Sequence, residues 1–151
     1  MSKSIITLLK HDHDEVGALL KQAMACSEKA SAKRSALFAK IRDALTVHTS
    51  FEEERIYPLL IAAKQSKSAV LEAYEEHNQI KCLLQDITDT EVTDERWSAK
   101  VTVLAEDVEH HVKEEEQPGG LFAKLRQATD NETLASLADE FEAIKHATGV
   151  M

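Results

Sequence analysis

The sequence predicts an all-α fold, an up-down-up-down four-helix bundle with an additional short C-terminal helix. Apolar residues recur at steps of three and four over long stretches, which is the period of a helix, and strict alternation of apolar and polar residues is almost absent. Aromatic residues make up only 5% of the 151 residues, and the chain has four glycines and two prolines. A β-sandwich or barrel needs more aromatic and more turn-forming residues, so the composition disfavours an all-β fold.

Four long helices are expected, joined by polar connections. Their apolar stripes cover residues 6–23, 37–59, 70–87 and 97–108, and the connections cover residues 26–35, 64–68 and 88–94. The second helix is expected to continue through Pro58 and bend there, because proline removes a backbone donor and clashes with the preceding turn. Pro118-Gly119-Gly120 ends the fourth helix. A fifth, shorter helix is expected after the capping box Thr129-Asp130-Asn131-Glu132, with its apolar stripe over residues 134–144.

Charge and cysteine usage restrict the classes of partner. The chain has 18 Lys+Arg and 27 Asp+Glu, a net charge of −9, so we expect metal cations rather than nucleic acid as partners. Cys26 and Cys82 are isolated, which indicates a reducing compartment and no disulfide framework. No apolar run approaches a membrane span, and the N-terminal apolar stretch is too short for a signal peptide. A cytoplasmic protein with no membrane partner is therefore expected.

Ionisable residues interrupt the apolar stripes of all four helices. They are His13 in the first helix, His48 and Glu52 in the second, His77 in the third, and His111 and Glu115 in the fourth. Residues spaced by three, four or seven share a helix face, so all six side chains are expected to point into the core. An unpaired polar or charged group costs roughly several kcal/mol there, which calls for a compensating partner.

The four histidines are also expected to lie at one level of the bundle. In an antiparallel hairpin, two residues lie at the same level when the turn falls midway between them. The midpoints of the successive histidine pairs lie at positions 30–31, 62–63 and 94, in or beside the three polar connections. A single inward histidine is more often an ordinary core residue. Four in one layer, with two glutamates one turn away, predict a metal centre.

The donor types restrict the metal. Imidazole and carboxylate suit iron, manganese or zinc, and the absence of thiolate disfavours a structural zinc site. Two HxxxE pairs suggest two metal ions with Glu52 and Glu115 bridging them. The Glu-x-x-His spacing of ferritin-like bundles is absent. His110 with Glu114 is an alternative to His111 with Glu115, and the periodicity favours His111. Tyr74 lies one turn from His77 on the inward side, so its hydroxyl could support that histidine. A plain core aromatic residue is the favoured interpretation.

The pattern H…HxxxE…H…HxxxE resembles that of the hemerythrin-like HHE cation-binding domain family. The matching segments are LLKHDHDEV, ALTVHTSFEEERIYPLL, YEEHNQI and VEHHVKEEEQ. The resemblance covers residues 1–126, which we expect to form the bundle, and leaves residues 127–151 as a C-terminal helix packed on it. It implies a non-haem di-iron centre with an open coordination position for a small molecule.

Two positions differ from the oxygen-carrying hemerythrins that the pattern resembles. Lys81 stands where those proteins have a second histidine, and Glu115 stands where they supply an aspartate. The loop after Glu115 also interrupts the Phe-Pro stretch that usually follows it. With fewer nitrogen donors the metals are expected to be more exposed and more reactive, which disfavours reversible oxygen storage.

The sequence therefore predicts a di-iron protein that binds or reacts with dioxygen, nitric oxide or hydrogen peroxide, in sensing or oxidative-stress defence. Catalase-like decomposition of peroxide is one activity that such a centre supports. Manganese or zinc are possible substitutes for iron. Two alternatives are an iron-homeostasis protein that senses or buffers iron, and a structural metal-binding bundle without redox activity. The sequence leaves the physiological ligand and the oligomeric state open.

Overall fold

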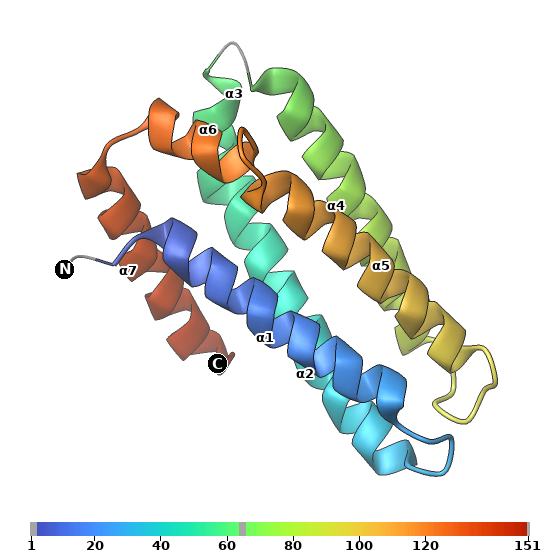
Figure 1. The fold of residues 1–151 in the computed structure, drawn as a ribbon. Coiled ribbons are helices and arrows are strands. Elements are labelled where there is room, and N and C mark those ends of the chain that lie inside the picture. Colours follow the sequence, from blue (N-terminus) through green and yellow to red (C-terminus); the bar gives the residue numbers. More distant parts are fainter. Residues whose placement is uncertain (1–2, 64–65, 151) are drawn as a thin grey trace.

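The computed structural model describes residues 3–63 and 66–150, and these residues form helices and short connections without a strand (Figure 1). The helices are α1 (Ile5–Ala25), α2 (Ser31–Phe51), the π-helix η1 (Glu52–Ile56), α3 (Tyr57–Ile61), α4 (Lys67–Thr88), α5 (Trp97–Glu116), α6 (Leu121–Ala128) and α7 (Asn131–Thr148). The polar connections expected at residues 26–35 and 88–94 lie at residues 26–30 and 89–96, so α2 begins earlier and α5 begins later than those bounds imply. The one expected at 64–68 includes residues 64 and 65, which lie outside the described residues.

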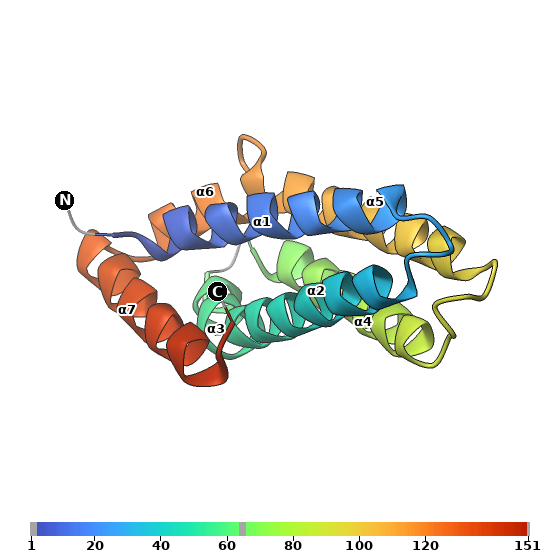
Figure 2. The same cartoon turned by 90° about the horizontal axis from the view of Figure 1, so that it is seen from below.

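The long helices pack as a four-helix bundle with an extra C-terminal helix, which confirms the predicted fold class. Figure 2 shows α1 and α5 in one layer and α2 and α4 in the other. Helix α1 contacts both α2 and α5, while α4 contacts α5 and α2. Helix α7 packs against α1 and α2 on the outside of the bundle (Figures 1 and 2). Among the described residues, no helix combines the length and hydropathy needed to cross a membrane.

The second bundle helix continues without a break from α2 through η1 into α3. A π-helical turn contains more residues than an α-helical turn, so it rotates every following side chain around the helix axis. Ile56 is buried as the period predicts, but after it Tyr57 and Leu60 are buried, and the predicted core position Leu59 is only partly buried. Pro58 lies in the first turn of α3, directly after the π-helical turn, where the helical hydrogen-bond pattern changes.

The buried apolar residues form two separate clusters. One contains Ile5, Ile6, Leu9, residues of η1 and α3, and residues of α6 and α7. The other contains Val16, Leu20 and buried residues from α2, α4 and α5. On α1, α2 and α4 the core histidine lies between residues of the two clusters, and on α5 His111 lies between the second cluster and the α6 residues of the first. The hydrophobic core is therefore divided by a polar layer, with one apolar cluster on each side of it.

The C-terminal region differs from expectation in three details. Asp130, rather than Thr129, caps α7, because its side chain accepts a hydrogen bond from the Thr133 backbone N–H. The short helix α6 is an element that the sequence did not predict, and it spans residue 126. The division of the chain at that residue stays a prediction. Buried residues of α7 join the first apolar cluster, whereas Ile144, expected on the same stripe, is 39% exposed.

A buried arginine joins two connections at the end of the bundle that lies opposite α7. Arg34 is only 1% exposed. Its guanidinium donates hydrogen bonds to the Val92 carbonyl (2.6 Å), the Cys26 carbonyl (3.3 Å) and Ser98 Oγ (2.8 Å). The same group lies 4.6 Å from the centre of the Trp97 ring. It therefore ties the α1–α2 connection to the α4–α5 connection.

We expect Arg34→Met to lower the free energy of unfolding by about 1–3 kcal/mol, because two carbonyls and a hydroxyl lose a buried donor. Chemical denaturation followed by circular dichroism measures this change. Arg42→Met is the matched control, since Arg42 lies on the same helix, its side chain is 42% exposed, and in the described part of the chain it forms an ion pair with the exposed Asp43. Equal midpoints for the two variants would contradict the role given to Arg34.

Candidate metal centre

The structure brings the six predicted residues together in two groups. One group consists of His13, His48 and Glu115, and the other of Glu52, His77 and His111. Within each group the ligand atoms lie within 4.8 Å of one another. The six side chains are at most 7% exposed. The polar layer between the two apolar clusters is thus a compact set of four imidazoles and two carboxylates.

Each helix supplies its histidine from the face that the periodicity predicted. The ring centres of His13 and His48 are 4.9 Å apart, and those of His77 and His111 are 4.6 Å apart. The first pair joins α1 to α2 and the second joins α4 to α5. The two hairpins of the bundle therefore contribute one pair of histidines each.

Each of the two glutamates belongs to one group and also lies close to a histidine of the other group. Glu115 Oε1 is 3.1 Å from His13 Nε2, while its Oε2 is 3.4 Å from His111 Nε2. Glu52 Oε1 is 3.4 Å from His48 Nε2 and 3.2 Å from His77 Nε2. Each carboxylate thus faces a histidine of both groups, which is the placement that a bridging ligand needs.

Several of the inward-facing atoms lack a hydrogen-bond partner although they are buried. They are His13 Nε2, His48 Nε2, both carboxylate oxygens of Glu52, and Glu115 Oε1. Buried polar atoms without partners are costly and rare in folded proteins. Divalent cations would satisfy these atoms and balance the carboxylates, and nitrogen with oxygen donors suits iron, manganese and zinc. The residues present therefore fit a two-metal centre.

The outer nitrogen of every core histidine faces a carboxylate. The distances to Nδ1 are 2.6 Å for Glu116 at His13, 3.1 Å for Asp12 at His48, 2.9 Å for Glu53 at His77, and 2.6 Å for Glu76 at His111. Because a carboxylate only accepts, Nδ1 carries the proton, and Nε2 is left to face the centre. Such partners fix the ring orientation of metal-ligating histidines and raise their basicity.

The supporting carboxylates follow a simple rule that the sequence contains. Each one is the sequence neighbour of a core residue on its own helix and supports a histidine on the adjacent helix. Helical periodicity did not place these four carboxylates at the centre. The acidic neighbour beside each ligand, as in Asp12-His13 and Glu76-His77, was the signal that could have found them.

Tyr57 is a residue of the centre that the sequence did not predict. Its hydroxyl lies 3.1 Å from His77 Nε2 and donates a hydrogen bond to Glu115 Oε2 at 3.3 Å. The π-helical turn rotates this side chain into the core, so a regular helical period does not place it there. Tyr74, which the sequence pattern placed near His77, packs edge-on against Tyr57. Its hydroxyl donates a hydrogen bond to the Glu53 carbonyl (3.4 Å).

The charges of the centre shift the pKa values of its members. Burial disfavours the charged form of His48, but the Glu52 carboxylate and the hydrogen bond to Asp12 outweigh it and raise the pKa of His48 to about 10. Burial also opposes the Glu52 carboxylate, yet His48 and its other partners hold the pKa of Glu52 well below its usual range. Burial and the two core glutamates raise the pKa of Tyr57, so its phenol keeps its proton.

The remaining histidines lie outside the centre. His110 is 63% exposed and pairs with Glu76 (3.2 Å) and Glu114 (3.1 Å) on the surface. His11 is exposed and pairs with Glu15, and His146 is exposed near the end of α7. Of the two adjacent histidines in α5, the structure therefore places His111 in the buried layer.

A small cavity adjoins the first group of ligands. Its volume is about 20 Å³, and it is lined by Asp12, His13, Val16, Leu45, His48, Thr49, Ile80, Val108, His111 and Val112. A cavity of this size holds about one water-sized molecule. Three imidazoles and an apolar wall thus enclose a space for a very small ligand.

We expect a divalent metal ion to raise the Tm of the wild-type chain and of His110→Ala by equal amounts, and that of His111→Ala by clearly less. An ion that binds only the folded state stabilises it by mass action, and His111 supplies a nitrogen of the buried centre. Thermal unfolding with and without ferrous iron in the absence of air measures the shift. A shift that survives His111→Ala and disappears in His110→Ala would place the site on the surface instead.

Comparison with known proteins agrees with this geometry. The hemerythrin HHE cation binding domain family matches residues 4–118. The crystal structure of a hemerythrin HHE cation binding domain-containing protein from Mycobacterium kansasii is similar in fold, with a TM-score of 0.79 and 21% sequence identity, over 97% of this chain and 87% of that chain. A DNA nickase from Nostoc sp. is 29% identical over 142 residues. That alignment covers 94% of this chain but only 39% of the nickase. Because the family match covers most of the sequence, the chain belongs to the hemerythrin HHE cation binding domain family.

Proposed function

We propose that this chain is a non-haem di-iron protein that binds or reacts with dioxygen, nitric oxide or hydrogen peroxide, in sensing or oxidative-stress defence. The observation that carries the proposal is the pair of buried three-residue ligand groups beside a cavity of about 20 Å³. The four core histidines would be terminal ligands, and Glu52 and Glu115 would bridge the two ions. The family, a cation-binding one, supports iron, and the donor set also accommodates manganese or zinc.

The bound iron and the residues of the chain would have different chemical roles. When bound, ferrous iron supplies electrons and an open coordination position for the ligand. The chain's own residues hold the donors in place and exclude water. The supporting carboxylates keep the proton on each Nδ1, so that the four Nε2 atoms stay directed inward. Tyr57 donates a hydrogen bond from its hydroxyl to Glu115 Oε2 at 3.3 Å, which orients that carboxylate toward the centre.

The size of the cavity favours a small ligand over an organic substrate. Its apolar side is formed by residues of all four bundle helices, including Val16, Leu45, Ile80 and Val108. Interiors are packed too closely to admit a larger molecule without rearrangement. Binding, sensing or removal of a diatomic molecule or peroxide is therefore a better match than metabolic catalysis.

The likeness to the Nostoc DNA nickase favours a second candidate function, cleavage of a phosphodiester at the same centre. Two metal ions are a common arrangement for that reaction. The buried ligands and the small cavity argue against it, because a nucleic acid backbone needs an open site. The expectation that nucleic acid is not a partner stays a prediction. Conversion of supercoiled plasmid to the nicked form by the metal-loaded chain would favour this candidate.

Loading with ferrous iron without air, followed by nitric oxide or hydrogen peroxide, tests the proposed function. We expect a new visible absorption band with nitric oxide, and peroxide consumption faster than that by the same amount of free iron. The physical reason is that the buried ligand groups would hold both ions beside a cavity that a small ligand can occupy. Iron uptake with neither result would contradict the proposal and indicate an iron buffer.

A cavity-filling variant makes this test specific for the site. Val108→Ile adds one methylene to the cavity wall, and an added methylene in a packed core costs roughly 1–3 kcal/mol. We expect unchanged iron content and nitric oxide binding weakened by about tenfold or more. Val103→Ile is the matched control, because Val103 lies on the same helix but is exposed. Equal binding by the two variants would show that the ligand does not enter this cavity.

A further inference from the structure

A lysine from outside the four-helix bundle reaches the edge of the metal centre. Lys145 lies on α7, beyond the residues 4–118 that match the family. Its Nζ is 2.5 Å from Asp12 Oδ1. The two side chains are 17% and 7% exposed, so this ion pair is largely buried. Most other lysine–carboxylate pairs in the described residues lie at the surface, where such pairs contribute little.

The Asp12 carboxylate connects this lysine to a core histidine. Its second oxygen, Oδ2, is 3.1 Å from His48 Nδ1. Lys145, Asp12 and His48 therefore form a continuous chain of hydrogen bonds that ends at a ligand of the first group. The same helix touches His48 a second time, because the Phe141 ring meets the His48 ring edge-on with centres 6.3 Å apart.

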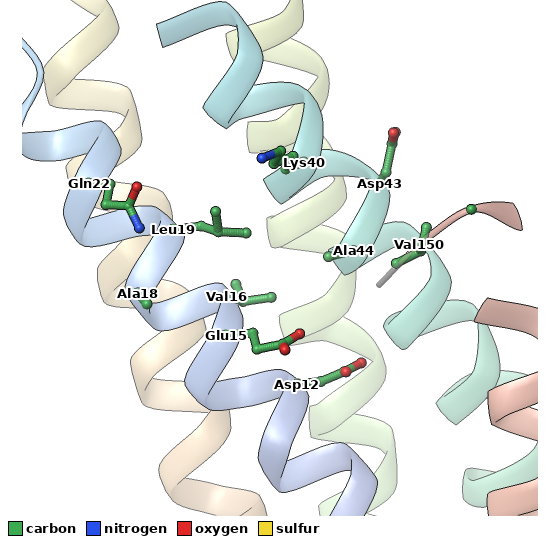
Figure 3. Close-up of a pocket in the computed structure, with 11 residues that line it drawn as sticks. Asp12, Glu15, Val16, Ala18, Leu19, Gln22, Lys40, Asp43, Ala44 and Val150 are labelled. Atoms are coloured by element: carbon green, nitrogen blue, oxygen red, sulfur yellow. The ribbon is translucent and has the colours of Figure 1, made fainter. Parts of the chain in front are cut away.

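The surroundings of Asp12 explain why its carboxylate needs an anchor. Asp12 lines both the small cavity at the centre and a groove of about 440 Å³ between α1 and α2. Figure 3 shows Asp12 at the edge of this groove, on the same helix as Glu15 and Val16. Glu15 and Asp43 also line the groove, together with Lys40, so carboxylates outnumber ammonium groups in its lining. Without Lys145, the Asp12 carboxylate would lose one of its two hydrogen bonds and could rotate toward the groove.

The other supporting carboxylates differ in their partners. Glu53, which supports His77, pairs with Lys81 at 2.8 Å, but Lys81 lies on the same helix as His77 and is 46% exposed. Among the described residues, no lysine pairs with Glu76 or Glu116. Lys145 thus differs from Lys81, because it lies on α7, a helix outside the bundle, and pairs with the carboxylate that supports His48.

We propose that α7 is part of the metal centre, because Lys145 anchors the Asp12 carboxylate that fixes the orientation of His48. Lys145 is a positioning residue, since it acts on the ligand through Asp12 and does not touch the ions. The inference rests on the proposed two-metal centre and adds that the first group, His13, His48 and Glu115, depends on α7. The second group has no such dependence.

Titration of the metal-free protein with Co²⁺, followed by its visible absorption bands, tests this inference. We expect the wild type to bind two ions. In Lys145→Met, one of the two affinities is expected to fall by about tenfold, the size of effect typical of partners of metal-ligating histidines. The other affinity is expected to stay unchanged. Lys145→Arg keeps a cation near Asp12 and is expected to restore most of the lost affinity.

The matched control is Lys3→Met, which removes an exposed ion pair between the start of the chain and Glu142 on the same α7 helix. We expect this variant to bind both ions as the wild type does. The Tm of each metal-free variant, measured by circular dichroism, reports any general loosening of α7. Equal weakening by Lys3→Met and Lys145→Met, or two unchanged affinities in Lys145→Met, would overturn the inference. Failure of the wild type to bind Co²⁺ would instead overturn the two-metal centre itself.

Discussion

The balance of charge in a buried polar layer is the constraint on which the rest of the structure depends. Six ionisable side chains occupy positions that the helical period assigns to the core, and several of their inward atoms have no hydrogen-bond partner. Such groups are tolerated only when charges and donors around them are held in place. The two apolar clusters close the layer on both sides, and four carboxylates hold the outer nitrogens of the histidines.

The π-helical turn and α7 adapt an ordinary bundle to this layer. The turn lets one helix direct both Glu52 and Tyr57 toward the same centre, although these residues are five positions apart. Helix α7 covers α1 and α2 and brings a cation within reach of Asp12. Both features modify the bundle where the layer lies, while Arg34 fastens the opposite end through backbone carbonyls.

Helical periodicity was sufficient to predict the fold class and the six core ionisable residues. Each of those residues interrupts an apolar stripe, and the midpoints of the histidine pairs indicate a single layer. Periodicity could not predict Tyr57 or the shift from Leu59 to Leu60, because one π turn changes the phase of the helix. It also could not predict the pairing of Lys145 with Asp12, since 133 positions separate them and only tertiary packing brings them together. Arg34 was missed for a similar reason, as a polar connection gives no sign of which polar residue becomes buried.

The number of iron ions retained per chain is the most direct test of the central claim. Metal-free protein would be incubated with excess ferrous iron without air and then desalted. The iron and protein concentrations of the desalted sample would give the number of ions per chain. The two ligand groups predict about two ions per chain, with each glutamate shared between them. Retention of fewer than one ion per chain would contradict the two-metal centre and leave the buried layer as a structural feature of the bundle.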